Sequence, residues 1–96
     1  MTVSLTDLQI RNAQPREKSY RLRAGRGLSI AVMPDGAKYW RYRYRYASKA
    51  KMISLGVYPE VGIKEANQRA AEARALLLKG INPSEQRREQ KLALRL

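Results

Sequence analysis

One stretch, residues 38–46, constrains the fold of this chain more than any other. It reads Lys-Tyr-Trp-Arg-Tyr-Arg-Tyr-Arg-Tyr, so aromatic residues alternate with arginines along most of its length. Successive side chains of a β-strand point to opposite faces, whereas a helix would mix the two kinds around its circumference. The alternation therefore predicts a strand with rings on one face (Trp40, Tyr42, Tyr44 and Tyr46) and an arginine stripe on the other (Arg41, Arg43 and Arg45). The guanidinium groups of the stripe would be spaced about 7 Å apart.

The charge of the chain indicates a polyanionic partner. Its 96 residues contain 20 Lys and Arg but only 8 Asp and Glu, a formal net charge of +12. Residues 16–51 hold eleven of the cations and two of the acids, so that they carry +9 of this charge. Such a concentration indicates nucleic acid or another acidic surface as the partner. The alternative is a basic domain whose charge serves only solubility.

The residues on which most enzymes rely are missing. The sequence has no cysteine and no histidine, which excludes a disulfide framework, a zinc ribbon and the commonest general base. Its eight acids are scattered singly and offer no carboxylate pair for a hydrolase. We therefore expect a binding domain and not an enzyme, with no cofactor and no metal site.

The sequence also indicates where in the cell the protein is expected. No apolar run approaches the roughly 20 residues that span a bilayer, and the first residues lack the apolar core of a signal peptide. We therefore predict a cytoplasmic protein without membrane contact.

Turn signals divide the first half of the chain into an antiparallel meander. Pro34, Asp35 and Gly36 suit a tight turn, because proline presets φ and glycine tolerates positive φ. The Gly25-Arg26-Gly27 segment is too short for a phosphate-binding loop and no helix is predicted after it, so we interpret it as a turn. Short connections between strands predict antiparallel pairing. The expected sheet has three strands, over residues 28–33, 38–46 and 52–55, plus a short first strand over residues 19–23.

Three helices are predicted around this sheet. A short N-terminal helix begins near Thr6, where Thr6 and Gln9 form a capping box. The main helix covers residues 62–79, and its small apolar stripe (Ile63, Ala66, Ala70, Ala73 and Leu77) would pack on the ring face of the sheet. Asn82 and Pro83 begin a C-terminal helix, with asparagine as the cap. The expected class is thus α+β, with a domain over residues 1–82 and a linker helix over 83–96; a frayed tail is the alternative for the latter.

A small β-ribbon fits the major groove of duplex DNA, where arginine binds guanine edges with two hydrogen bonds. We expect Arg41, Arg43 and Arg45 to do this. The residues beside them on neighbouring strands are small or flexible (Ser29, Ala31, Met52 and Ser54), which lets the sheet approach the bases closely. The remaining predicted DNA contacts are Arg21, Arg23, Lys49 and Lys51 at phosphates, Ser29, Ala31 and Ser54 beside the stripe, and Lys38 and Tyr39 at the start of the central strand.

Several segments taken together resemble the N-terminal arm-type DNA-binding domain of prophage and genomic-island integrases, which are tyrosine recombinases. The similarity covers about residues 5–83 and depends on Leu5-Thr6-Asp7, Gly27-Leu28, residues 34–44 (Pro-Asp-Gly-Ala-Lys-Tyr-Trp-Arg-Tyr-Arg-Tyr), Leu55-Gly56-Val57-Tyr58-Pro59 and Glu65-Ala66. Three positions depart from the pattern: Gly62 stands where Ser or Thr usually caps the helix, Asn67 where arginine is usual, and Ala24-Gly25 where the turn usually has Asp.

The resemblance implies a non-catalytic domain whose sheet enters the major groove of repeated arm sites beside a recombination core. It implies the bacterial cytoplasm and nucleoid as the location. The implied partners are double-stranded DNA, the integrase's own core-binding and catalytic domains, an excisionase and a DNA-bending host factor.

Two other functions use different surfaces. If Trp40, Tyr42 and Tyr44 were exposed, they could stack on unpaired bases, as in single-strand binding proteins. The alanine-rich helix stripe would then have nothing to cover. Alternatively, the helix after Asn82 could mediate protein assembly.

Overall fold

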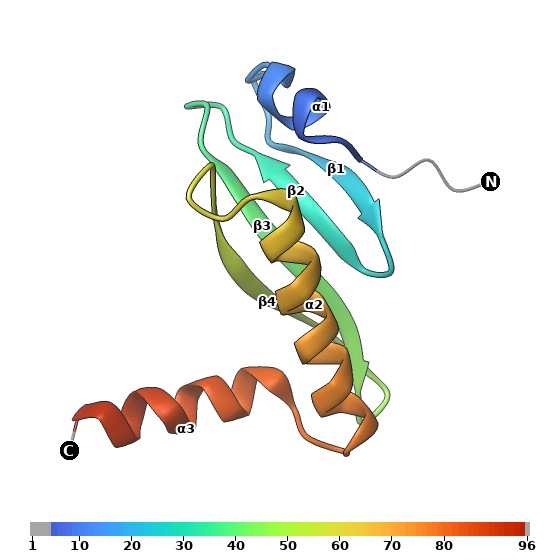
Figure 1. The fold of residues 1–96 in the computed structure, drawn as a ribbon, viewed down its shortest axis with the longest axis vertical. Helices are drawn as coiled ribbons and strands as arrows, with labels where there is room; N and C mark the ends of the chain where they lie inside the picture. The colour runs from blue at the N-terminus through green and yellow to red at the C-terminus, as the bar shows by residue number, and fades with distance from the viewer. Residues whose placement is uncertain (1–4, 96) are drawn as a thin grey trace.

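The computed structural model of this protein describes residues 5–95. It has α+β architecture, with one antiparallel sheet of four strands in the order β1-β2-β3-β4 and three helices (Figure 1). In chain order the elements are α1 (Asp7–Asn12), β1 (Tyr20–Gly25), β2 (Leu28–Val32), β3 (Lys38–Tyr46), β4 (Lys49–Tyr58), α2 (Ile63–Leu78) and α3 (Pro83–Arg95).

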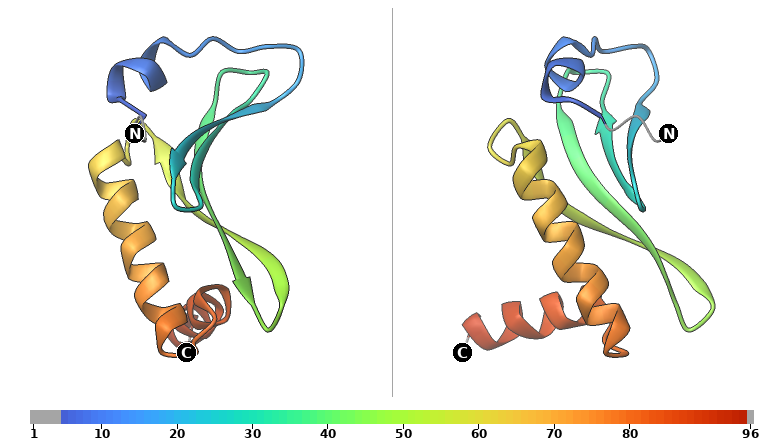
Figure 2. Two further views of the ribbon diagram at one scale, coloured as in Figure 1. Left: turned by 90° about the vertical axis from the view of Figure 1, so that its right-hand side faces the viewer. Right: turned by 45° about the vertical axis from the view of Figure 1, so that its right-hand side comes forward.

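The molecule has two layers, and only one face of the sheet is covered. Figure 2 (left) shows α2 running along one side of the sheet, while none of the described helices lies over the other side. The covered side holds the core, in which Trp40 and Ile30 are fully buried and Tyr42 and Tyr44 nearly so. Ala66, Ala70 and Ala73 of α2 are buried against these rings, which confirms the predicted stripe. Small side chains on the helix leave room for large ones on the sheet.

A glycine lets the covered face close over the tryptophan. Trp40 pairs with Gly56 of β4, and its indole N–H donates to the Val61 carbonyl oxygen at 2.6 Å. A Cβ at Gly56 would lie 2.5 Å from Val61 Cγ2, and the φ of Gly56 is +124°. Any other residue there would therefore push Val61, and the start of α2 with it, away from the sheet.

The fourth strand is longer than predicted and changes face along its length. It covers residues 49–58 instead of 52–55, because the two-residue turn Ala47-Ser48 keeps it paired with β3 from Lys49 onward. Between the pairs Arg41–Ser54 and Trp40–Gly56 the register shifts, so Leu55 is an extra residue in β4. This bulge reverses the alternation. Leu55 and Gly56 both face the core side, and Val57 emerges on the open side.

The first strand is a full member of the sheet, and the prediction of three strands plus a short one is corrected to four. β1 has six residues and pairs with β2 from Tyr20–Val32 to Gly25–Leu28. Its inward residues Leu22 and Ala24 pack against the core. The alternation of apolar and charged residues at 19–23 covers only part of this strand, which continues to Gly25.

The helix caps follow the sequence closely. Thr6 Oγ1 accepts from the Gln9 N–H at 3.2 Å and Gln9 Oε1 accepts from the Thr6 N–H at 2.9 Å, which confirms the capping box. At the end of α2, Gly80 has a φ of +78°, as expected for the residue that ends the helix. Asn82 Oδ1 accepts from the Ser84 N–H at 3.0 Å and so caps α3. Gly62 begins α2 without a side-chain cap.

The predicted linker is helical over residues 83–95. Residue 96, the last of the predicted linker, and residues 1–4 of the predicted domain lie outside the described residues. Within residues 5–95 no helix is both long and apolar enough to cross a bilayer.

Candidate nucleic-acid interface

Strand register defines the uncovered side of the sheet. Residues paired directly across an antiparallel ladder point to the same face, so the pairs of Arg41 with Ser29 and Ser54, and of Arg43 with Met52, extend the arginine stripe across the sheet. We call this side the open face; it consists of Arg21, Arg23, Ser29, Ala31, Tyr39, Arg41, Arg43, Arg45, Ala50, Met52, Ser54 and Val57.

The open face is strongly cationic and has no internal counter-charge. The four strands contain eight Lys and Arg and no Asp or Glu. Among residues 5–95 the ion pairs are Asp7–Arg11 and Glu65–Arg69, both within helices. The five open-face arginines make no side-chain hydrogen bond to any described residue. Four of them (Arg21, Arg23, Arg43 and Arg45) are exposed and Arg41 is half-buried. Their charge is thus available to an anionic partner.

The small residues of β2 lie below the surface of this face. Ser29 and Ala31 are only 6% and 2% exposed, so β2 is buried on both sides. They were predicted as places where the sheet comes close to bases. The register does put them beside Arg41 and Tyr39, but in a layer beneath the longer side chains.

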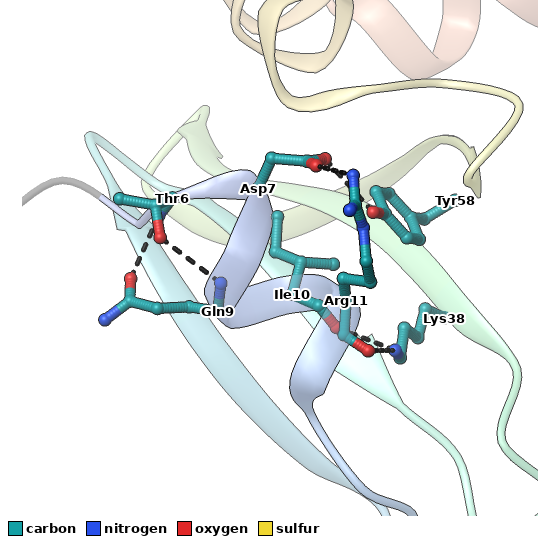
Figure 3. Close-up of polar contacts among 7 residues, drawn as sticks. All are labelled: Thr6, Asp7, Gln9, Ile10, Arg11, Lys38 and Tyr58. Atoms are coloured by element: carbon teal, nitrogen blue, oxygen red, sulfur yellow. Dashed lines mark hydrogen bonds and ion pairs between the residues drawn. The ribbon is translucent and has the colours of Figure 1, made fainter.

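Lys38 does not join the other predicted contacts. It is paired with Tyr58 two residues before Trp40 and therefore points to the covered side. Its ammonium donates to the carbonyl oxygens of Ile10 and Arg11, at 2.7 and 3.4 Å, at the end of α1 (Figure 3). A cation is stabilised there by the unpaired carbonyls of the last helical turn. We therefore leave Lys38 out of the interface.

Lys49 and Lys51 also fall on the side opposite the arginines. They pair with Tyr46 and Tyr44, whose rings face the core, although both lysines are exposed because the hairpin extends beyond the core. The sequence prediction assigned these lysines to phosphates without considering which face of the strand they occupy. Alternation within β4 places Lys49 and Lys51 opposite Ser54, and the register with β3 places Ser54 beside Arg41.

The covered side uses its arginines to bind backbone carbonyls. Arg69 donates to the Leu55 carbonyl oxygen at 2.8 Å and to Glu65 at 3.0 Å, and Arg87 of α3 donates to the Ser54 carbonyl oxygen. Burial lowers the pKa of Arg87, and the nearby charge of Arg69 lowers it further. On α1, the Tyr58 hydroxyl, followed by the Asp7 carboxylate, raises the pKa of Arg11. These cations belong to the scaffold.

Three residues near the open face were missed by the sequence prediction. Arg26, in the β1–β2 turn, was interpreted only as part of a turn. Val57 was missed because the strand was expected to stop before it. Met52 was noted only as a flexible neighbour; it is 47% exposed and Val57 is 39% exposed. Gly56 was the available signal, since an isolated glycine in a strand pattern often marks a bulge.

The aromatic side of β3 is unavailable for stacking on bases. Trp40 is completely buried and hydrogen-bonded, and Tyr42 and Tyr44 stack on each other with ring centroids 5.8 Å apart beneath α2. The three rings that the single-strand hypothesis requires to be exposed are therefore buried. The described part of the chain also contains no group of acidic, histidine or cysteine side chains that would bind a metal ion.

The sequence of the chain is similar to those of known proteins. Residues 5–90 match the family model described as an arm DNA-binding domain. The chain is 45% identical to the prophage integrase IntZ of Escherichia coli (strain K12) over 89 residues, which are 91% of this chain and 22% of that protein. It is 38% identical to the prophage integrase IntA of the same strain over 93% of the chain and 22% of the relative. It is 37% identical to the integrase of Enterobacteria phage P4 over 84% of the chain and 19% of that protein. The chain thus spans about a fifth of the length of these relatives.

Proposed function

Because this chain belongs to the arm DNA-binding domain family of integrases, we propose that its open face binds arm-type attachment sites by entering the major groove of duplex DNA. The observation that carries the proposal is the arginine distribution. Five arginines share the uncovered side of a rigid sheet, and no acid occurs in any of its strands. A surface of this kind attracts a polyanion and gains affinity by releasing counterions.

The dimensions of the sheet support major-groove entry. Neighbouring strands lie about 4.8 Å apart and the groove is about 12 Å wide, so two to three strands fit across it. With β3 at the centre, Arg41, Arg43 and Arg45 reach base edges, where arginine binds guanine through two hydrogen bonds. The outer strands then meet the phosphates. Met52 and Val57 offer apolar contacts of the kind that thymine methyl groups accept.

In the whole integrase, the domain serves as a tether. Arm binding raises the local concentration of the core-binding and catalytic domains at the recombination site, and α3 leads toward them as the linker. An excisionase and a DNA-bending host factor would decide which arm sites are bridged. This activity belongs in the bacterial cytoplasm, at the nucleoid.

A salt titration tests the electrostatic part of the proposal. A duplex selected from a random library serves as the probe. With four to six phosphate contacts, the log–log slope of affinity against salt should be roughly −4 to −5. A slope near zero would contradict the proposal, and so would equal or tighter binding of the single strands of the same probe.

Arg41→Ala tests the site itself. If Arg41 reads a base, its loss should cost roughly 1–3 kcal/mol of binding free energy on the selected duplex and much less on a duplex of mixed sequence. Lys64→Ala, which removes an exposed cation from α2, is the control. Equal effects of the two substitutions would overturn the site assignment.

A further inference from the structure

A pocket at the β1–β2 turn gathers more positive charge than the arginine stripe explains. It has a volume of about 350 Å³ and is lined by Arg21, Arg23, Arg26, Ser29 and Arg43, together with Gly25, Gly27 and Leu28. We call it the turn pocket. Four of its lining residues are arginines and none is acidic, so four like charges surround one small space. Such an arrangement is relieved by an anion.

The turn that forms the pocket is fixed in place. The Gly27 carbonyl oxygen accepts from the Arg43 N–H at 2.8 Å, and a Cβ at Gly27 would lie 2.4 Å from the Arg43 carbonyl oxygen. On the other side Arg74 of α2 donates to the Arg26 carbonyl oxygen at 3.4 Å. Glycine at position 27, with a φ of +86°, is thus required for the turn to approach β3. The backbone of the turn is thus set before any ligand binds, whereas the exposed guanidinium groups of Arg21, Arg23 and Arg43 make no hydrogen bond to a described residue and are free to turn toward a ligand.

A buried hydroxyl in the pocket has no partner. Ser29 is 94% buried, and its Oγ is the one buried side-chain nitrogen or oxygen atom in residues 5–95 without a hydrogen-bond partner. The arginines around it have donors only, so they cannot accept the Ser29 proton. A buried polar group left unpaired costs about 1–3 kcal/mol. An acceptor would satisfy the Ser29 O–H, and the positive charge of the surrounding arginines favours an anionic one.

The pocket lies where the proposed DNA complex has its backbone. β1 is two strands from β3, about 10 Å away at normal strand spacing. Half the width of the major groove is only about 6 Å. If β3 faces the base edges, β1 and its turn therefore reach the groove wall, which consists of phosphates.

We propose that the turn pocket binds one phosphodiester group of the DNA backbone, with Arg26 and the Ser29 hydroxyl as the residues that hold it. This inference rests on the proposed duplex-binding function, and it adds a contact at a turn that the arginine stripe does not include. Because a phosphate carries no sequence information, the contact should strengthen binding to every duplex alike.

The first test replaces Arg26. Two probes are used, a duplex selected from a random library and a duplex of mixed sequence, with the 96-residue chain. Arg26→Ala should weaken binding to both by about threefold to tenfold and reduce the salt slope by about 1. Arg88→Ala, which removes the same charge from the exposed side of α3, should leave the slope within error of the original.

The second test replaces the hydroxyl. Ser29→Ala should weaken binding of both duplexes by about fivefold to tenfold, while resistance to urea stays the same or rises because an unpaired buried group has been removed. Ser19→Ala, at an exposed position before β1, is the control. A loss of urea resistance with unchanged affinity would give the hydroxyl a structural role and overturn its part in the proposal.

A modified probe locates the phosphate. Neutral methylphosphonates replace the phosphates of the duplex one at a time. At one position the replacement should reduce the affinity of the original chain as much as Arg26→Ala does. The same replacement should not reduce the affinity of the Arg26→Ala variant any further. Suppose that the original chain binds duplex DNA and that Arg41→Ala weakens this binding, yet Arg26→Ala changes affinity and salt slope no more than Arg88→Ala does. The turn pocket then does not bind a phosphate, and the proposed function stands. If the original chain binds no duplex, the proposed function fails first.

Discussion

The two sides of the sheet differ in how the cations beside them are used. On the covered side, Lys38, Arg69 and Arg87 each donate to backbone carbonyls of a neighbouring element. On the open face, the guanidinium groups of Arg41, Arg43 and Arg45 have no partner among residues 5–95. A cation that satisfies a carbonyl stabilises the fold, whereas one without a partner remains available for a ligand. The charge of a residue does not by itself show its role; the groups that its side chain contacts must be known as well.

The sharpest contrast is between neighbours on β3. Trp40→Ala should lower the free energy of unfolding by about 3–5 kcal/mol, because it empties a fully buried site and leaves the Val61 carbonyl without its donor. Arg43→Ala, on the exposed side of the same strand, should change it by less than about 0.5 kcal/mol. Urea unfolding followed by circular dichroism measures both. Similar losses would mean that the two faces are not distinct.

Removing the charged group of one arginine from each side of the sheet tests whether the two sides differ. Arg69→Met should reduce stability by about 1 kcal/mol, a partial loss because the side chain is partly exposed, and leave DNA affinity intact. Arg45→Met should do the reverse, weakening duplex binding while the unfolding midpoint stays in place. Both variants keep an unbranched apolar stem, so only the charged group differs. Matching profiles for the two variants would remove the distinction between scaffold and ligand-binding cations.

Tyr44 tests whether the covered side of the sheet also holds α3 in place. Its hydroxyl donates to Asn82 Oδ1 at 2.7 Å and lies 2.6 Å from Ser84 Oγ at the start of α3. Tyr44→Phe should cost about 1 kcal/mol of stability and loosen α3, seen as faster amide exchange there, without changing DNA affinity. Tyr46→Phe is the matched control, since its hydroxyl makes only an exposed contact of 3.3 Å. Equal effects of the two would argue against a specific link.

The smallest effect is expected at the β3–β4 turn, which belongs to neither face. Ala47 and Ser48 have φ of 52° and 64°, a region that non-glycine residues adopt at a cost. Replacing the pair by Asn-Gly, the preferred sequence for such a two-residue hairpin turn, should raise stability by about 0.5–1 kcal/mol in thermal unfolding. DNA affinity should not change. A destabilised variant would show that the turn has another conformation.

Much of the fold follows from local patterns. The alternation in residues 38–46, the capping box at Thr6 and the spacing of the alanines in α2 each appear in the structure as predicted. The predictions that needed correction concern lengths and faces: the full first strand, the ten-residue fourth strand, and the side on which Lys38 lies.

The sequence by itself determined which residues alternate and where helices begin and end, because backbone geometry fixes a period of two for strands and 3.6 for helices. Only the tertiary structure decided which residues of neighbouring strands lie beside the arginine stripe, because that depends on pairing between strands and, for Val57, on one bulged residue, Leu55. The same holds for the turn pocket and for the attachment of α3 to Tyr44. Each brings together side chains from separate segments, and such contacts depend on how the elements pack and not on the order of residues within any one of them.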